Sequence, residues 1–272
     1  LMMARLNRAW IIFSTGICFA IFGIGGIIIA LALFPIIGII SGNDAAQRKA
    51  VQRTICWVFK RFVSIMQFLG VMELTKIGAN SLAGAKGEII IANHPTLIDV
   101  VLIGSMLDEF DCIVKEALWQ NPALKGVVSA ADFIPNSTGD ELIQECMNRL
   151  AQGRNLIIFP EGTRSVPGKP MKLLRGAAQI ALRSGAPLRL IQITCNPPTL
   201  GKNEKWYQSP AVKPEFTINV RETLDPNSFM KKYKDFPPAA RHLTNKIKLE
   251  LSAQWPTPII ENLKKSNAAC QT

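Results

Sequence analysis

The chain has 272 residues, of which 48% are hydrophobic, and it carries a formal net charge of +11. Its length suits one domain of ordinary size preceded by an apolar segment. A basic excess is typical of nucleic-acid-binding proteins, but the sequence has no zinc-knuckle spacing, helix-turn-helix pattern or basic-aromatic motif to support that class. Six scattered cysteines without metal-ligand spacing indicate reduced thiols, with neither a disulfide framework nor a metal site.

The N-terminal segment is predicted to be embedded in a membrane. No charged side chain occurs from Ala9 to Asn43, and residues 10–40 form a largely apolar run. As one helix this run would be roughly 46 Å long, which exceeds the ~30 Å hydrocarbon core of a bilayer. A tilted span fits this length, and so does a re-entrant hairpin bent at the glycines or at Pro35, which would bring the basic residues at its two ends to one side. A cleaved signal peptide would have a shorter apolar run and a small-residue cleavage site.

The next segment is predicted to form an amphipathic helix. From Gln47 to Leu69 the apolar residues recur with helical spacing, and basic residues fall on the other faces. A helix of this kind can lie in the membrane interface with its basic side toward anionic headgroups. Packing against the following domain would produce the same pattern.

The rest of the chain alternates between short β-rich runs and helical stretches, which predicts an α/β fold with a central mixed sheet flanked by helices. The predicted strands are Glu88–Ala92, Asp111–Val114, Asn155–Phe159, Arg189–Cys195 and Phe216–Val220. The predicted helices include Leu97–Leu107, Gly139–Gln152 and Leu174–Ser184. The expected organisation is a membrane-embedded segment at 1–43, an amphipathic interfacial helix at 44–76 and an α/β domain at 77–272.

A polar turn with catalytic potential follows the first predicted strand. It reads Asn93-His94-Pro95-Thr96-Leu97-Ile98-Asp99 and leads into a predicted helix, where α/β folds commonly place ligands and catalysts. The carboxylate of Asp99 can accept a hydrogen bond from one nitrogen of His94, which fixes the tautomer and leaves the other nitrogen basic. Such an imidazole is well matched to deprotonating an alcohol near neutral pH. A helix-capping role for Asp99 fits the same residues.

A second polar turn, Pro160-Glu161-Gly162-Thr163-Arg164-Ser165, follows a later strand. Gly162 permits an unusual backbone path and the close approach of a ligand. Arg164 offers a fork of donors suited to a phosphate or carboxylate, and Thr163 is an auxiliary donor. The alternative is a surface turn in which Glu161 and Arg164 pair with each other.

Together the two turns resemble the glycerolipid acyltransferase family, which includes the 1-acylglycerol-3-phosphate acyltransferases. The first matches the family's Asn-His-x-x-x-x-Asp motif, and the second, with Phe159 before it, matches the Phe-Pro-Glu-Gly-Thr-Arg-Ser motif. Their order and separation are also similar, and the resemblance covers roughly residues 50–200. It implies that His94 is the general base and that Asp99 orients it. It also implies that the second turn shapes the acceptor site with Glu161, Gly162, Thr163 and Arg164.

Two positions depart from the family pattern. Asn136 stands where relatives commonly have an arginine, and Leu190 stands where they usually have a second proline. The lost cation leaves open a lysolipid other than lysophosphatidic acid, such as a lyso-aminolipid. Lys115 stands where relatives often have lysine, so it is a candidate for the missing positive charge in the acceptor site.

The resemblance implies a membrane-bound O-acyltransferase of phospholipid biosynthesis that works without a cofactor. Its partners would be membrane lipids and a thioester co-substrate, either acyl-CoA or acyl-carrier protein. Direct transfer is favoured because the sequence has no Gly-x-Ser-x-Gly nucleophile elbow. A lipid hydrolase in which His94 activates water and a non-catalytic lipid-binding relative are the alternatives. The expected location is the cytoplasmic face of a bacterial inner membrane.

Overall fold

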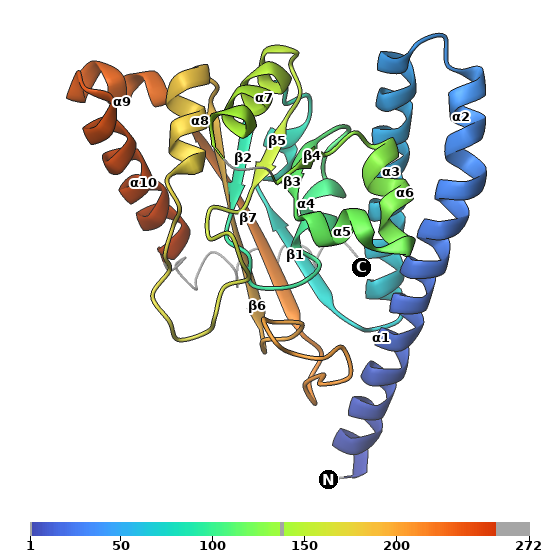
Figure 1. The fold of residues 1–272 in the computed structure, drawn as a ribbon. Helices are drawn as coiled ribbons and strands as arrows, with labels where there is room; N and C mark the ends of the chain where they lie inside the picture. Colours follow the sequence, from blue (N-terminus) through green and yellow to red (C-terminus); the bar gives the residue numbers. More distant parts are fainter. Residues whose placement is uncertain (1, 137–138, 254–272) are drawn as a thin grey trace.

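Two long antiparallel helical arms lie beside an α/β domain in the computed structural model, which describes residues 2–136 and 139–253 (Figure 1). The first arm consists of α1 (Met2–Ile28), a π-helical turn (Ile29–Leu33) and α2 (Phe34–Ile40). The second arm is α3 (Asp44–Phe68), which begins after a tight turn. The side chain of Asn43 caps α3 by accepting a hydrogen bond from the amide of Ala46 at 2.9 Å.

The first arm continues through Pro35 without a break, so the structure shows no bend of the re-entrant kind at this proline. Proline has no amide hydrogen and crowds the preceding turn, which usually kinks or ends a helix. Here the residues just before the proline form the π-helical turn, in which the amide of Phe34 bonds to the carbonyl of Ile29, five residues earlier. By length and composition, Leu6–Ile40 is the one helix of the described residues that could cross a membrane. The bases near its start and those after Asn43 therefore lie at opposite ends of this arm.

Helix α3 packs one of its faces against the α/β domain. Such packing was the alternative to a position in the membrane interface. Its buried side chains include Val51, Ile55, Val63 and Met66, while Trp57 and Phe68 on other faces are exposed. Several of its basic residues pair with acids of the domain, which leaves less charge for a lipid surface than the sequence indicated. These pairs are Arg48 with Asp132, and Lys49 and Arg53 with Glu109.

The described part of the domain contains a seven-stranded mixed sheet with the order β1-β7-β6-β2-β5-β3-β4. The strands are β1 (Glu73–Ile77), β2 (Ile89–Ala92), β3 (Asp111–Val114), β4 (Ile134–Pro135), β5 (Leu156–Ile158), β6 (Leu188–Asn196) and β7 (Glu215–Leu224). All neighbouring strands are parallel except β6 and β7. The carboxyl ends of β2, β3, β4, β5 and β6 therefore share one edge. The sheet already begins at Glu73, four residues before the expected start of the domain at residue 77.

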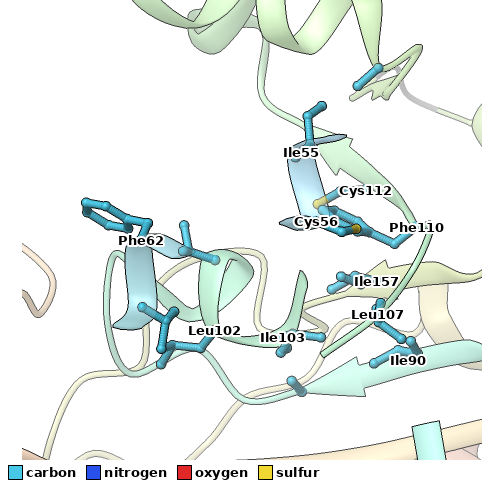
Figure 2. Close-up of a cluster of buried hydrophobic side chains, with 14 of the residues drawn as sticks. Ile55, Cys56, Phe62, Ile90, Leu102, Ile103, Leu107, Phe110, Cys112 and Ile157 are labelled. Atoms are coloured by element: carbon cyan, nitrogen blue, oxygen red, sulfur yellow. The ribbon is translucent and has the colours of Figure 1, made fainter. Parts of the chain in front are cut away.

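Helices cover both faces of the sheet, which confirms the predicted α/β class (Figure 1). The remaining helices are α4 (Asp99–Gly104), α5 (Glu116–Gln120), α6 (Pro122–Ala130), α7 (Asp140–Ala151), α8 (Gly176–Ser184), α9 (Pro226–Tyr233) and α10 (Phe236–Ser252), with a short 3-10 turn at Ala79–Leu82. Alternate residues of a strand point to opposite faces. Thus Ile90 packs under α3 and α4, as Figure 2 shows, whereas Ile89 and Ile91 pack under α7, α8 and α10.

Candidate active site

The turn after β2 places the imidazole of His94 against a buried carboxylate. His94 Nδ1 lies 2.7 Å from Asp99 Oδ2, and the Asp99 side chain is fully buried whereas that of His94 is 21% exposed. A carboxylate can only accept, so Nδ1 carries the proton and Nε2 keeps its lone pair. The ring of His94 also stacks on that of Phe159, with centroids 4.3 Å apart and planes inclined by 26°. The arrangement therefore fixes the ring and leaves one basic nitrogen accessible.

Asp99 also holds the turn itself together. Its Oδ2 accepts from the amide of Thr96 at 2.7 Å, and its Oδ1 accepts from the Thr96 hydroxyl at 2.5 Å. Burial raises the pKa of the Asp99 carboxyl, while the hydrogen bonds from His94 and Thr96 oppose this rise. The two roles considered for Asp99 thus coexist: it bonds back to the turn in the manner of a capping box, and it contacts the imidazole.

The second polar turn forms hydrogen bonds to the backbone of His94. Glu161 Oε1 accepts from the His94 amide at 3.1 Å and from the Ser165 hydroxyl at 2.6 Å. The Ser165 amide in turn donates to the His94 carbonyl at 2.7 Å. Glu161 therefore bonds to the His94 turn, whereas the alternative interpretation of the sequence paired it with Arg164. This network gives Glu161 a means of positioning His94, whereas the family resemblance implied an acceptor-binding role.

Replacement of Glu161 by alanine distinguishes these two roles. The change leaves the His94 amide and the Ser165 hydroxyl without their acceptor and allows the imidazole to shift. We expect kcat to fall about 10- to 100-fold, as for a small displacement of a catalytic group, with little change in the acceptor KM. Steady-state kinetics in the folded variant measures both constants. A large rise in KM at unchanged kcat would instead support direct acceptor binding.

Arg164 reaches from the second turn to the loop between β6 and β7. Its Nη1 donates to the carbonyls of Leu200 at 3.0 Å and Gly201 at 2.7 Å. In the same turn, Gly162 adopts φ +65, a left-handed conformation that favours glycine. Thr163 is partly buried beside it. Arg164 lines a cleft next to the His94 turn, and part of its fork is engaged by the loop backbone.

Residues 73–194 match the protein family described as Acyltransferase. The matched segment runs from β1 into β6 and contains both polar turns. The likeness to this family covers 122 of the 272 residues of the chain. The chain is similar to the 1-acyl-sn-glycerol-3-phosphate acyltransferase of Helicobacter pylori, with 30% identity over 127 residues that cover 44% of this chain and 52% of that protein.

Two further comparisons extend this likeness. The chloroplastic 1-acyl-sn-glycerol-3-phosphate acyltransferase BAT2 of Brassica napus is 26% identical over 105 residues, covering 37% of this chain and 30% of that protein. The chain thus spans about half or less of these relatives' length. The crystal structure of the 1-acyl-sn-glycerophosphate (LPA) acyltransferase PlsC from Thermotoga maritima matches with a TM-score of 0.67 at 20% identity, covering 93% of this chain and 100% of that one. This last likeness confirms the fold.

The two positions discussed for the acceptor charge are neighbours in the fold. Lys115 follows the end of β3 and is exposed, and Asn136 follows the end of β4. The amide of Asn136 donates to the carbonyl of Val114 at 3.0 Å, which ties these two strand ends together. Lys115 therefore lies beside Asn136, at the sheet edge that carries the two polar turns. Lys115 thus carries a positive charge next to the position at which Asn136 replaces the arginine of the family pattern.

Sequence reasoning missed two side chains that shape this site. Asn93 extends the sheet beyond the end of β2, because its side-chain amide donates to the Ile193 carbonyl and its Oδ1 accepts from the Ile193 amide, both at 2.7 Å. The strand pairing of β2 with β6 is thereby continued by a side chain up to His94. Ser165 was seen only as part of a motif. A polar residue directly after a buried strand was the available signal for Asn93.

Proposed function

We propose that the protein is a membrane-bound acyltransferase that moves a fatty acyl group from a thioester to a hydroxyl of a lysolipid. The observation that carries this proposal is the contact between His94 and the buried Asp99, held in place by Glu161. The named activity of the matched relatives supports lysophosphatidic acid as the acceptor. A lysolipid with another headgroup, such as a lyso-aminolipid, is the second candidate, because Asn136 stands in place of the family's arginine.

The proposed reaction is a direct transfer between the two substrates. Nε2 of His94 takes the proton of the acceptor hydroxyl while that oxygen forms a bond to the thioester carbon. The carbon–sulfur bond then breaks, and the proton held by the imidazole passes to the leaving thiolate. Asp99 stabilises the imidazolium that forms in between, since its carboxylate faces Nδ1. Arg164 and Lys115 supply positive charge toward an anionic acceptor headgroup.

Acyl transfer is tested by supplying the purified protein with lysophosphatidic acid and a long-chain acyl thioester. Acyl-CoA and acyl-carrier protein are offered separately, because the proposal leaves the carrier open. Mass spectrometry is expected to detect phosphatidic acid, formed in proportion to the thiol released. Free fatty acid as the main product would indicate a hydrolase in which His94 activates water. Absence of turnover both with lysophosphatidic acid and with a lyso-aminolipid supplied in its place would favour a lipid-binding relative.

Membrane attachment is expected to survive high-salt washing. Exposed apolar side chains lie along the first helical arm, including Phe13, Ile24, Leu31 and Ile39, and burial of such side chains in lipid is little affected by salt. Membranes washed in 1 M salt, at roughly a 3 Å Debye length, should retain the full-length protein, while detergent should release it. A peripheral membrane protein in the same sample serves as the control. Release of the acyltransferase by salt alone would contradict an integral attachment.

We place the α/β domain on the cytoplasmic face of a bacterial inner membrane.

A further inference from the structure

A cleft lies between α1 and the loop that joins β6 to β7, at the sheet edge that carries the polar turns. Its volume is about 420 Å³, within the range of roughly 300–1,000 Å³ that is common for small-ligand sites. The lining residues used below are Phe19, Leu97, Arg164, Glu204, Lys205 and Trp206. Leu97 belongs to the same turn as His94, so the cleft opens beside the proposed catalytic base.

The loop is fixed to α1 by aromatic and polar contacts. The rings of Trp206 and Phe19 lie with centroids 6.3 Å apart. The indole also sits over Gly16, where a Cβ would lie 3.2 Å from Trp206 Cζ3. Nearer the N-terminus, Asn7 Nδ2 donates to the carbonyl of Ala211 at 2.9 Å. The first helical arm thus forms one wall of the cleft, and a lipid lying against this arm would be adjacent to the cleft entrance.

The other wall is tied to the two polar turns. The carbonyl of Leu200 accepts from Arg164 Nη1 at 3.0 Å and from the amide of Leu97 at 3.1 Å. Glu204 Oε2 accepts from the amide of Gly201 at 2.7 Å, which engages the carboxylate of the cleft with the loop backbone. Arg164 is therefore a positioning residue for this loop as well as a cation of the cleft.

Lys205 contributes the second cation of the cleft. Its Nζ lies 5.6 Å from the centroid of the Tyr207 ring, and the side chain is exposed. A cation–π contact orients the ammonium without using its hydrogen-bond donors, so these donors are available to a ligand. The two positive charges of Arg164 and Lys205 outnumber the single negative charge of Glu204, so the lining of the cleft has a net positive charge. Such a lining favours an anionic group over a neutral one.

We propose that this cleft admits the lysolipid from the membrane and binds its headgroup, and that Lys205 makes the acceptor site select an anionic headgroup. Lys205 thereby supplies the cleft with a cation that neither family motif contains. The apolar wall of Phe19 and Trp206 accommodates the first part of the acyl chain. This inference rests on the proposed acyl transfer and adds to it a specificity-determining residue outside both family motifs.

The test compares Lys205→Gln with Lys202→Gln in the full-length enzyme. Lys202 is an exposed lysine of the same loop that does not line the cleft, so its replacement removes the same charge from the same surface. For lysophosphatidic acid presented in neutral detergent micelles, Lys205→Gln should raise KM roughly ten-fold, as expected for a lost charge-assisted hydrogen bond, with kcat changed less than two-fold. Lys205→Arg should keep KM within about three-fold, because the cation is retained. The KM of the thioester donor should not change.

Trp206→Ala supplies an independent measurement of the apolar wall. Removal of the indole should raise the acceptor KM for a long-chain lysophosphatidic acid more than for a short-chain one, and thermal unfolding checks that the variant is folded. Equal KM values in Lys205→Gln and the wild type, or an equal rise in Lys202→Gln, would overturn the inference while leaving acyl transfer intact. If the wild type itself does not acylate lysophosphatidic acid, the proposed acceptor fails, and the role of Lys205 fails with it.

Discussion

Replacement of His94 by alanine is expected to lower acyl transfer by about 10³-fold, within the range for loss of a general base. Without the imidazole, whose Nδ1 contacts the buried Asp99, no Nε2 is present to take the proton of the acceptor hydroxyl. Folding and membrane attachment should be largely unaffected, because the ring lies at an edge of the sheet and is partly exposed. The measurement is kcat/KM for the acceptor in the purified variant, with circular dichroism as the check on folding.

His242 provides a matched control for this substitution. It is the other histidine of the chain and lies on α10, where its ring stacks on Tyr233 with centroids 4.0 Å apart. Its replacement by alanine removes a similar ring from a helix that packs on the opposite face of the sheet from α3 and α4. His242→Ala should retain near-normal turnover. A His94→Ala protein that is folded and keeps more than a tenth of the activity would exclude His94 as the base.

Replacement of Asp99 by asparagine is expected to lower kcat roughly 10³-fold, because the amide no longer holds the Nδ1–H tautomer of His94 or stabilises the imidazolium. The carboxylate also accepts two hydrogen bonds from Thr96 inside a fully buried site. Asparagine keeps only one acceptor oxygen, and loss of the other should lower the free energy of unfolding by about 1–3 kcal/mol. Chemical denaturation and steady-state kinetics on the same preparation separate the two effects.

Thr96→Val is the control that isolates the contact with the imidazole. It removes the hydroxyl that donates to Asp99 Oδ1 but leaves the contact of Oδ2 with His94. Its turnover should fall less than ten-fold, while its stability should fall by about 1 kcal/mol. If Asp99 only caps the turn, Asp99→Asn and Thr96→Val should behave alike, with losses of about 1 kcal/mol in stability and near-normal turnover.

Much of the fold could be predicted because its central strands are buried on both faces and read as short apolar runs. The runs around Ile90 and Ile157 are of this kind, and each became a central strand. The first strand was missed, since Glu73–Ile77 is an edge strand with a partly exposed, mixed sequence that continues the pattern of α3. Pro35 was expected to permit a bend, but a widened helical turn absorbed it. Local helix propensity alone does not predict whether a helix bends at a proline or continues through it.

The candidate site was predictable where a motif lies within one turn, as for His94 and Asp99. Their contact depends on five residues of local backbone, so the sequence spacing limits the geometry. The partners of Glu161 and Arg164 could not be predicted, because they lie on segments far apart in the sequence. Lys205 stands in a loop without a motif, and its position in the cleft follows only from the packing of that loop on α1.

Direct attack by the activated hydroxyl, without a covalent acyl-enzyme, is tested most directly by following thiol release from a labelled acyl thioester. The purified enzyme is first mixed with the thioester alone, and lysophosphatidic acid is added afterwards. We expect no release above the uncatalysed rate until the acceptor is present, and then one phosphatidic acid for each thiol. A burst of thiol equal to the enzyme concentration before the acceptor is added, with label bound to the protein, would contradict His94 acting as a base on the acceptor.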